Sequence, residues 1–421
     1  MRESVTSTFG VVTPAARRIL TGNLISAVGS GVTLPFFIIY LGEVRGLGIA
    51  TAGLLVAFLS IVTLVATPGV GALVDRWGPR PVLMAGLVIT AVSVGSLGWV
   101  ASVPAAVIVL IVLGIGDAAL WAPQSALYAR VTPRQDRQKL FGLQFMCLNL
   151  GLSVGGMLGA VIANVADPSS FVLLYLLDAA TFVVYLAILI PMRGVGVGPA
   201  REQSDAAADD APQGRSSSGY REVLRDRAVV RLAVASIFLL TFGYGSLEVG
   251  LPVYITQVAG LDLSMVGWAY AVNAGAIVIG QLFVLSLIQG RSRSLLGGLV
   301  GLLWAVSWVA IGAAAHVPVA AAVVAVLVGM LVFAFGETIW SPVAPAIAND
   351  LAPDHLRGRY NALLSWSWAF SGVLGPGVTG LLLGAGHDVA WLIVIVAGLV
   401  IAAVLLVSLR RVLTPEQDGR S

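Results

Sequence analysis

The 421 residues are 58% hydrophobic and only 11% charged, with a formal net charge of +3 and a mean hydropathy of +0.95. A soluble globular domain carries about a quarter charged residues, so this composition excludes a soluble protein and predicts one that crosses a membrane many times. The single cysteine, Cys147, excludes an internal disulfide, and three scattered histidines indicate no metal site, so we expect no cofactor.

Twelve hydrophobic runs follow one another along the chain, and each is long enough to cross a membrane as a helix. In chain order we expect these spans at residues 19–41, 50–72, 82–102, 104–129, 140–164, 170–192, 231–257, 264–289, 295–315, 317–346, 360–384 and 389–409. The first run is too long for a cleaved signal peptide, so we expect it to remain as a span.

The basic residues predict the orientation of these spans. With the N-terminus inside, all but one of the 24 Lys and Arg residues fall in inside segments, and the exception is Arg45. Positive residues concentrate in cytoplasmic loops. We therefore expect a multi-pass protein of the cell membrane with both termini in the cytoplasm.

A long polar stretch divides the spans into six and six. Residues 193–230 are rich in Ala, Asp, Ser, Gly and Pro, which cannot form a core, so a cytoplasmic linker is expected there. The predicted domains are therefore a first six-helix bundle at 1–192, the linker at 193–230 and a second bundle at 231–421.

The two halves repeat one sequence pattern. WAPQSALYARVTP begins at Trp121 and WSPVAPAIANDLAP begins at Trp340, an offset of 219 residues. A Gly-rich span follows in each half. In the first half Gly151, Gly155 and Gly159 recur at helical spacing, which favours close approach of two helices. Two homologous halves produced by duplication explain this pattern best.

One short loop carries a family resemblance. Between the second and third runs, GALVDRWGPRP places Gly71, Asp75, Arg76, Gly78 and Arg80 at the spacing of the signature loop of the major facilitator superfamily, which the chain resembles. The second-half loop, LIQGRSRSLL, keeps two arginines but has no acid.

The segment LAPDHLRGRYNAL, with Glu337 in the preceding span, is similar to the drug-exporter-like branch of that superfamily. The resemblance implies an all-α membrane protein with twelve transmembrane helices in two pseudo-symmetric six-helix bundles. It also implies secondary transport by alternating access and a gating role for the signature loop.

The span centres contain no Lys or Arg, but four acids lie inside the spans. They are Asp117, Asp178, Glu248 and Glu337. Ionisable residues inside a membrane are costly and are candidates for function. Each acid could carry a proton or contact a cationic substrate, or it could be a structural acid held by hydrogen bonds. Asp117 and Glu337 lie 220 residues apart, close to the repeat offset, and are the strongest pair.

Polar and aromatic residues within the spans are candidates for lining a central cavity. Packing, or a hydrogen bond between helices, is the alternative for each of them. The candidates are Asn23, Gln124, Tyr128, Asn149, Tyr244, Asn273 and Trp340.

These observations favour a proton-coupled exporter of neutral or cationic amphipathic small molecules, because an interior with acids and no cations disfavours anionic substrates. Import of a nutrient or metabolite is the alternative. A membrane enzyme or a sensor is disfavoured, because we find no convergent catalytic set and no soluble output domain. The expected partners are a small molecule, protons and the lipid bilayer, with no nucleic acid, and we expect a monomer.

Overall fold

The computed structural model of the protein describes residues 13–133, 137–192, 194–195, 222–288, 290–353 and 357–420. These residues form helices and connecting turns, with no strand among them. The chain divides into two compact units, Met1–Leu47 with Phe58–Ala211 and Gly48–Ala57 with Pro212–Ser421. Most of the predicted linker at 193–230 lies outside the described residues, although α10 begins within it at Arg227.

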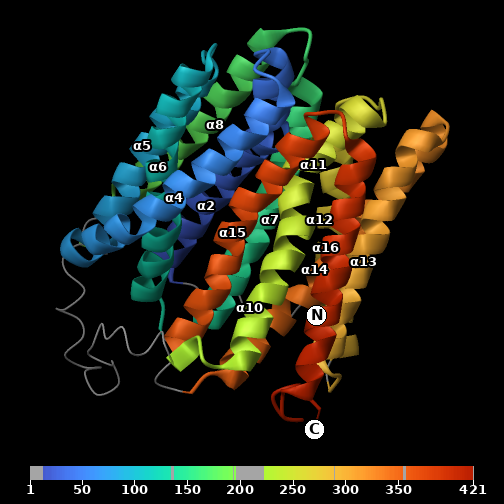
Figure 1. Ribbon diagram of the computed structural model, residues 1–421. Helices are drawn as coiled ribbons and strands as arrows, with labels where there is room; N and C mark the ends of the chain where they lie inside the picture. The colour runs from blue at the N-terminus through green and yellow to red at the C-terminus, as the bar shows by residue number, and fades with distance from the viewer. Residues whose placement is uncertain are drawn as a thin grey trace. The chain divides into compact units, whose positions relative to one another are not determined.

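Six long helices lie mainly in the first unit (Figure 1), and the start of one of them, α4, is grouped with the second unit. They are α2 (Pro14–Thr33, extended by helical turns to Val44), α4 (Ile49–Trp77), α5 (Pro79–Leu97), α6 (Val103–Val131), α7 (Arg137–Ile162) and α8 (Pro168–Leu189).

Six further helical stretches form the second unit. They are α10 (Arg227–Leu240) continuing into α11 (Ser246–Val253), α12 (Ser264–Ile288), α13 (Arg293–Ala313), α14 (Val319–Leu351), α15 (Arg357–Leu383) and α16 (Asp388–Ser408). Two π-helical turns, Thr241–Gly245 and Tyr254–Val258, flank α11 and make this the most irregular helical stretch of the unit.

The predicted fold class is confirmed. Among the described residues, ten helical stretches are long and apolar enough to cross a membrane, and α12 and α15 complete the twelve predicted helices. Helices satisfy their own backbone hydrogen bonds, which the interior of a bilayer requires.

Several helices begin where the sequence supplies a capping side chain. Asp167 accepts a hydrogen bond from the Ser169 amide (3.0 Å) at the start of α8, and Asp226 accepts one from the Ala228 amide (2.8 Å) at the start of α10. Pro168 follows its cap directly, in a position where the missing N–H costs nothing. These caps define the ends that hydrophobicity alone leaves uncertain.

The same helix pairs pack in both units, which supports the predicted duplication. The first helix of each unit packs against the fifth and sixth, as α2 does with α7 and α8, and α10 with α15 and α16. The third helix packs against the fourth and sixth, as α5 does with α6 and α8, and α13 with α14 and α16.

The predicted close approach at the glycine-rich span is also confirmed. A Cβ atom added at Gly155 of α7 would lie 2.0 Å from the carbonyl oxygen of Val28 on α2, and one at Gly151 would lie 2.5 Å from the Ala27 side chain. Small residues here let α2 and α7 pack backbone against backbone.

Candidate functional site

Glu337 is a hydrogen-bonded acid inside a span of the second unit. It lies in the middle of α14, and each of its carboxylate oxygens accepts one hydrogen bond. The Tyr244 hydroxyl, from the π-helical turn after α10, donates to Oε1, and the Asn273 amide of α12 donates to Oε2 at 2.6 Å. Three of the residues selected from the sequence therefore meet at one point.

Aromatic rings surround the Tyr244 end of this group. The Tyr244 ring packs edge-on against Trp304 (5.1 Å between centroids) and Phe333 (5.8 Å), and at a tilt against Trp368 (5.0 Å). The Trp304 indole donates to the Phe333 carbonyl at 3.0 Å, which fixes its ring. Glu337 is therefore an acid bonded on both oxygens at the edge of an aromatic cluster.

Glu248 differs from Glu337 in having no hydrogen-bond partner among the described residues. Its side chain, on α11, is exposed and makes no hydrogen bond or ion pair with any described residue. Its carboxylate is close enough to interact electrostatically with Tyr244 and Tyr270. The Tyr270 hydroxyl donates to the Leu247 carbonyl at 2.9 Å, so this ring packs against the same helix.

The two acids of the first unit lie near one another. Asp178 of α8 is 2% exposed, and its Oδ2 accepts a hydrogen bond from the Thr33 hydroxyl at 2.7 Å. Its Oδ1 is buried with no hydrogen-bond partner among the described residues. Asp117 of α6 is partly buried, likewise has no partner in the described part of the chain, and interacts electrostatically with Asp178.

Three predicted cavity residues of the first unit are buried polar groups. Gln124 is 5% exposed and accepts a hydrogen bond from the Tyr185 hydroxyl at 3.0 Å. The Oδ1 of Asn23 and the hydroxyl of Tyr128 are buried without a hydrogen-bond partner in the residues described. Unpaired buried polar atoms are costly, so these two could bind a polar ligand or water.

Two other candidates have local roles. The Asn149 amide donates to the carbonyl of Phe145, one turn earlier in α7, at 2.9 Å. Trp340 is 5% exposed, so its ring is part of the packed interior of the second unit.

The signature loop contains one buried and two exposed charges. Gly78 has φ of +89°, a conformation that favours glycine, and it ends α4 just before Pro79 opens α5. Arg80 is 9% exposed and donates to the carbonyls of Leu189 (3.0 and 3.2 Å) and Ile190 (2.9 Å) at the end of α8. Asp75 and Arg76 are exposed, with no partner among the described residues. Gly71 is partly exposed, and a Cβ atom there would meet no atom within 4 Å.

Sequence reasoning missed three polar partners. Thr33 and Tyr185 were not singled out, because their distance from Asp178 and Gln124 along the chain hides the pairing. Asp418 was missed because it lies in a polar C-terminal segment that resembles a solvated tail. Burial raises its pKa, but hydrogen bonds from Ser292 and Ser294 and the charge of Arg420 outweigh that effect and lower the pKa below 3.8.

Comparisons with known proteins agree with this architecture. The chain is 26% identical over 373 residues to the uncharacterized MFS-type transporter YttB of Bacillus subtilis, covering 88% of each chain. It is 27% identical over 330 residues to the multidrug resistance protein MdtH of Aeromonas hydrophila, covering 76% of this chain and 75% of that one.

Among solved structures, a peptide transporter POT in complex with sulfate has a TM-score of 0.74 at 16% identity, covering 96% of this chain and 95% of the other. At that identity the likeness concerns the fold alone. The family model of the Major Facilitator Superfamily matches residues 19–341, and the protein therefore belongs to the Major Facilitator Superfamily, a family of membrane transporters and not of enzymes.

Proposed function

We propose that this protein is a proton-coupled exporter of neutral or cationic amphipathic small molecules, working as a monomer in the cell membrane with both termini cytoplasmic. One observation supports this more than any other. Glu337, an acid inside a membrane span, has both oxygens bonded by uncharged donors and lies beside an aromatic cluster. Among the described residues no basic side chain pairs with it, so a proton or a cationic substrate is the natural counter-charge.

The geometry at Glu337 is suited to gaining and losing a proton. An ionised carboxylate accepts from both Tyr244 and Asn273, as observed. Protonation at Oε1 turns that oxygen into a donor, and the Tyr244 hydroxyl can then accept, because a phenol both donates and accepts. One hydrogen bond reverses while the Asn273 bond stays in place.

In the first unit, Asp117 and Asp178 are the second candidate proton site. Two nearby carboxyl groups in a low-dielectric setting do not both ionise readily, so one of them can hold a proton. The Oδ1 of Asp178, buried and without a hydrogen-bond partner among the described residues, is the oxygen on which we place that proton. Asn23, Gln124 and Tyr128 provide polar atoms in the same unit that could contact a substrate.

The substrate class follows from charge and from the rings. Acids without Lys or Arg disfavour anions, whereas aromatic faces attract cations and stack on flat apolar groups. The accessible Glu248 is the candidate contact for a cationic group. The relative named a multidrug resistance protein supports export, and uptake of a nutrient or metabolite is the alternative.

The signature loop is the proposed gate. Asp75 and Arg76 are exposed and free to change partners, whereas Arg80 is anchored on the end of α8. We assign the moving contacts of the gate to the two exposed charges and the fixed base to Arg80.

The proposal is tested in membrane vesicles with an imposed pH gradient and a panel of cationic, neutral and anionic compounds. We expect gradient-driven movement of cationic or neutral amphiphiles, and at least about a tenfold loss in Glu337→Gln and in Asp117→Asn if each carries a proton. Glu416→Gln, at an exposed acid outside the spans, is the matched control and should transport normally.

If none of the compounds moves, the exporter proposal is wrong. If Glu337→Gln and Asp117→Asn both retain full gradient-driven transport, neither acid carries the proton.

A further inference from the structure

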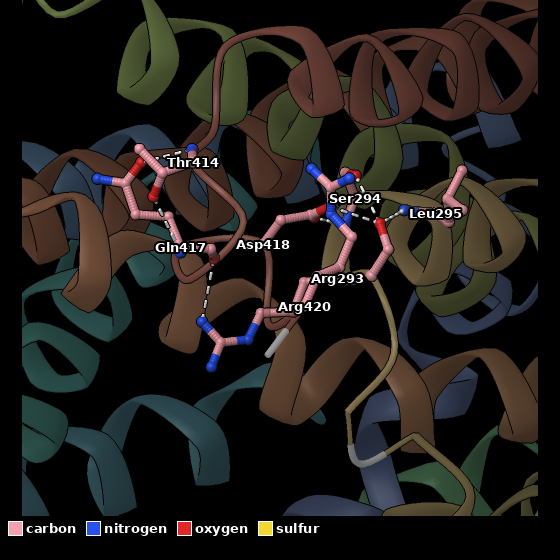
Figure 2. Close-up of polar contacts among 8 residues, drawn as sticks. Arg293, Ser294, Leu295, Thr414, Gln417, Asp418 and Arg420 are labelled. Carbon is pink, nitrogen blue, oxygen red and sulfur yellow. Dashed lines mark hydrogen bonds and ion pairs between the residues drawn. The ribbon is translucent and has the colours of Figure 1, made fainter.

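The C-terminal segment covers the start of α13. Residues 414–420, here named the C-terminal clasp, follow α16 and the helical turn Leu409–Arg411. Figure 2 shows Asp418 pointing at the α13 start, where Arg293 and Ser294 lie. This start belongs to the second-half loop that carries Arg291 and Arg293 but no acid of its own. The clasp brings an acid to that loop from far along the chain.

Asp418 is the centre of the contact. Its side chain is fully buried, its Oδ2 accepts from the Ser292 hydroxyl at 2.6 Å, and its Oδ1 accepts from the Ser294 amide at 2.8 Å. Arg420 forms an ion pair with Oδ2 at 2.8 Å. Ser292 also caps α13, accepting from the Leu295 amide at 3.4 Å. A carboxylate at a helix N-terminus is favoured by the helix dipole and by free amides.

Arg293 connects the clasp to a second helix. Its backbone amide donates to the Asp418 carbonyl at 2.8 Å, and its guanidinium donates to the Gln417 carbonyl at 3.2 Å. The same guanidinium forms an ion pair with Asp350 near the end of α14. That pair is partly exposed and weak by itself, so the bonds of Arg293 to Gln417 and to the Asp418 backbone are needed to hold its side chain beside Asp350.

The clasp is a defined structure and not a loose tail. The Thr414 backbone amide donates to the side-chain oxygen of Gln417 at 3.1 Å, and the Gln417 backbone amide donates to the Thr414 hydroxyl at 3.3 Å. Gly419 has φ of +74°, which lets the chain turn, and a Cβ atom there would lie 3.1 Å from the Arg293 side chain.

The first unit has a corresponding contact between its third and sixth helices. There, Arg80 at the start of the third helix donates to carbonyls at the end of the sixth, Leu189 and Ile190. In the second unit, Arg293 at the start of the third helix donates to the segment that follows the sixth. In both units, therefore, an arginine at the start of the third helix contacts the chain at or after the end of the sixth. Among the described residues, only the second unit adds a buried acid to this contact.

We propose that Asp418 is a positioning residue of the transporter: through Arg293, the C-terminal clasp holds the end of α14, the helix that carries Glu337. Asp350 lies 13 residues after Glu337 in one continuous helix, about 20 Å along its axis. Movement of the Asp350 end of α14 therefore changes the position of the Glu337 carboxylate relative to its hydrogen-bond donors. The functional part of this inference rests on the proposed proton-coupled transport.

The first experiment tests the clasp without relying on transport. In a Cys147→Ser background, Ser294→Cys places a thiol reporter at a position that is 0% exposed beneath Asp418. We expect slow maleimide labelling, accelerated about tenfold by Asp418→Asn or by deletion of residues 414–421, because the segment then opens locally. Glu416→Gln, two residues away and exposed, should leave the rate unchanged. Equal labelling rates in all variants would overturn the clasp.

The second experiment tests the link to α14. Asp418→Asn and Asp350→Asn should each slow gradient-driven transport about threefold, and the double variant should be no slower than the slower single one, because both act through Arg293. Losses that multiply, or no loss in Asp418→Asn, would refute the positioning role. A parent protein that transports nothing would instead contradict the proposed function, and the labelling result would still decide whether the clasp exists.

Discussion

Glu337 and Glu248 illustrate how two acids of one unit can have different environments. Glu337 accepts two hydrogen bonds, one on each oxygen, whereas Glu248 has no partner among the described residues. A hydrogen bond to a charged group is worth about 1.5–3 kcal/mol, so the two bonds at Glu337 strongly restrain the carboxylate. We therefore propose Glu337 as the site where the proton binds and Glu248 as the contact for a variable cationic ligand.

Removing the Tyr244 hydroxyl tests this assignment. Tyr244→Phe keeps the ring among Trp304, Phe333 and Trp368 but removes the donor to Glu337. We expect the gradient-driven transport rate to fall roughly tenfold, because the hydroxyl donates a hydrogen bond to the ionised carboxylate and accepts one from the protonated carboxyl group.

The control for this variant is Tyr254→Phe. The Tyr254 hydroxyl donates to the Gly312 carbonyl at 2.8 Å and touches none of the four acids. Similar rates for both tyrosine variants would show that the loss reflects packing and not the bond to Glu337.

At this scale the sequence identified the right residue types but not their pairing. Tyr244, Asn273 and Glu337 were each predicted as candidates, because polar groups in spans are rare and costly. These three side chains meet because three different helical segments pack together. A single sequence does not show which faces of its helices contact one another. Asp418 was missed for the same reason, since nothing local to it indicates burial.

The helices themselves were more predictable than their ends and their irregular turns. The predicted run 317–346 corresponds to α14, which continues to Leu351 because a helix ends at its cap and not at its last apolar residue. The π-helical turns that flank α11 were not predicted beyond the suggestion of an interrupted helix. Such turns depend on the packing of neighbouring helices, which hydrophobic periodicity does not contain.

Close packing of α2 and α7 gives a prediction about stability. Gly155→Ala places a Cβ atom 2.0 Å from the Val28 carbonyl oxygen, so the two helices must separate. Alanine favours a helix by about 0.5–1 kcal/mol over glycine, but overpacking costs about 1–3 kcal/mol. We therefore expect a lower unfolding temperature in detergent, measured by the change in tryptophan fluorescence on heating.

Gly69→Ala is the control for this prediction. A Cβ atom at Gly69, in the middle of α4, meets no atom within 4 Å. Its unfolding temperature should be unchanged or slightly higher. A stability of Gly155→Ala equal to that of Gly69→Ala would contradict the close contact between α2 and α7.

At the scale of the whole molecule, two units with the same helix pairings agree with membership of the Major Facilitator Superfamily. The twelve-helix fold could be predicted from the sequence because apolar runs that cross a bilayer must be helices, and because duplication left the same pattern in both halves. The substrate could not, because it is chosen by a few side chains that converge from several helices. The acids and the aromatic cluster are the basis on which we propose a class of compound.

Substrate-induced proton movement through Glu337 is the most direct test of the central claim. Purified protein is reconstituted in liposomes that contain a pH-sensitive dye, and a cationic amphiphile that the vesicle assay shows to be transported is added. We predict a proton flux opposite to the movement of the compound, lost in Glu337→Gln and retained in Glu416→Gln. Transport of the compound with no proton flux, or an equal flux in Glu337→Gln, would contradict proton coupling at this acid.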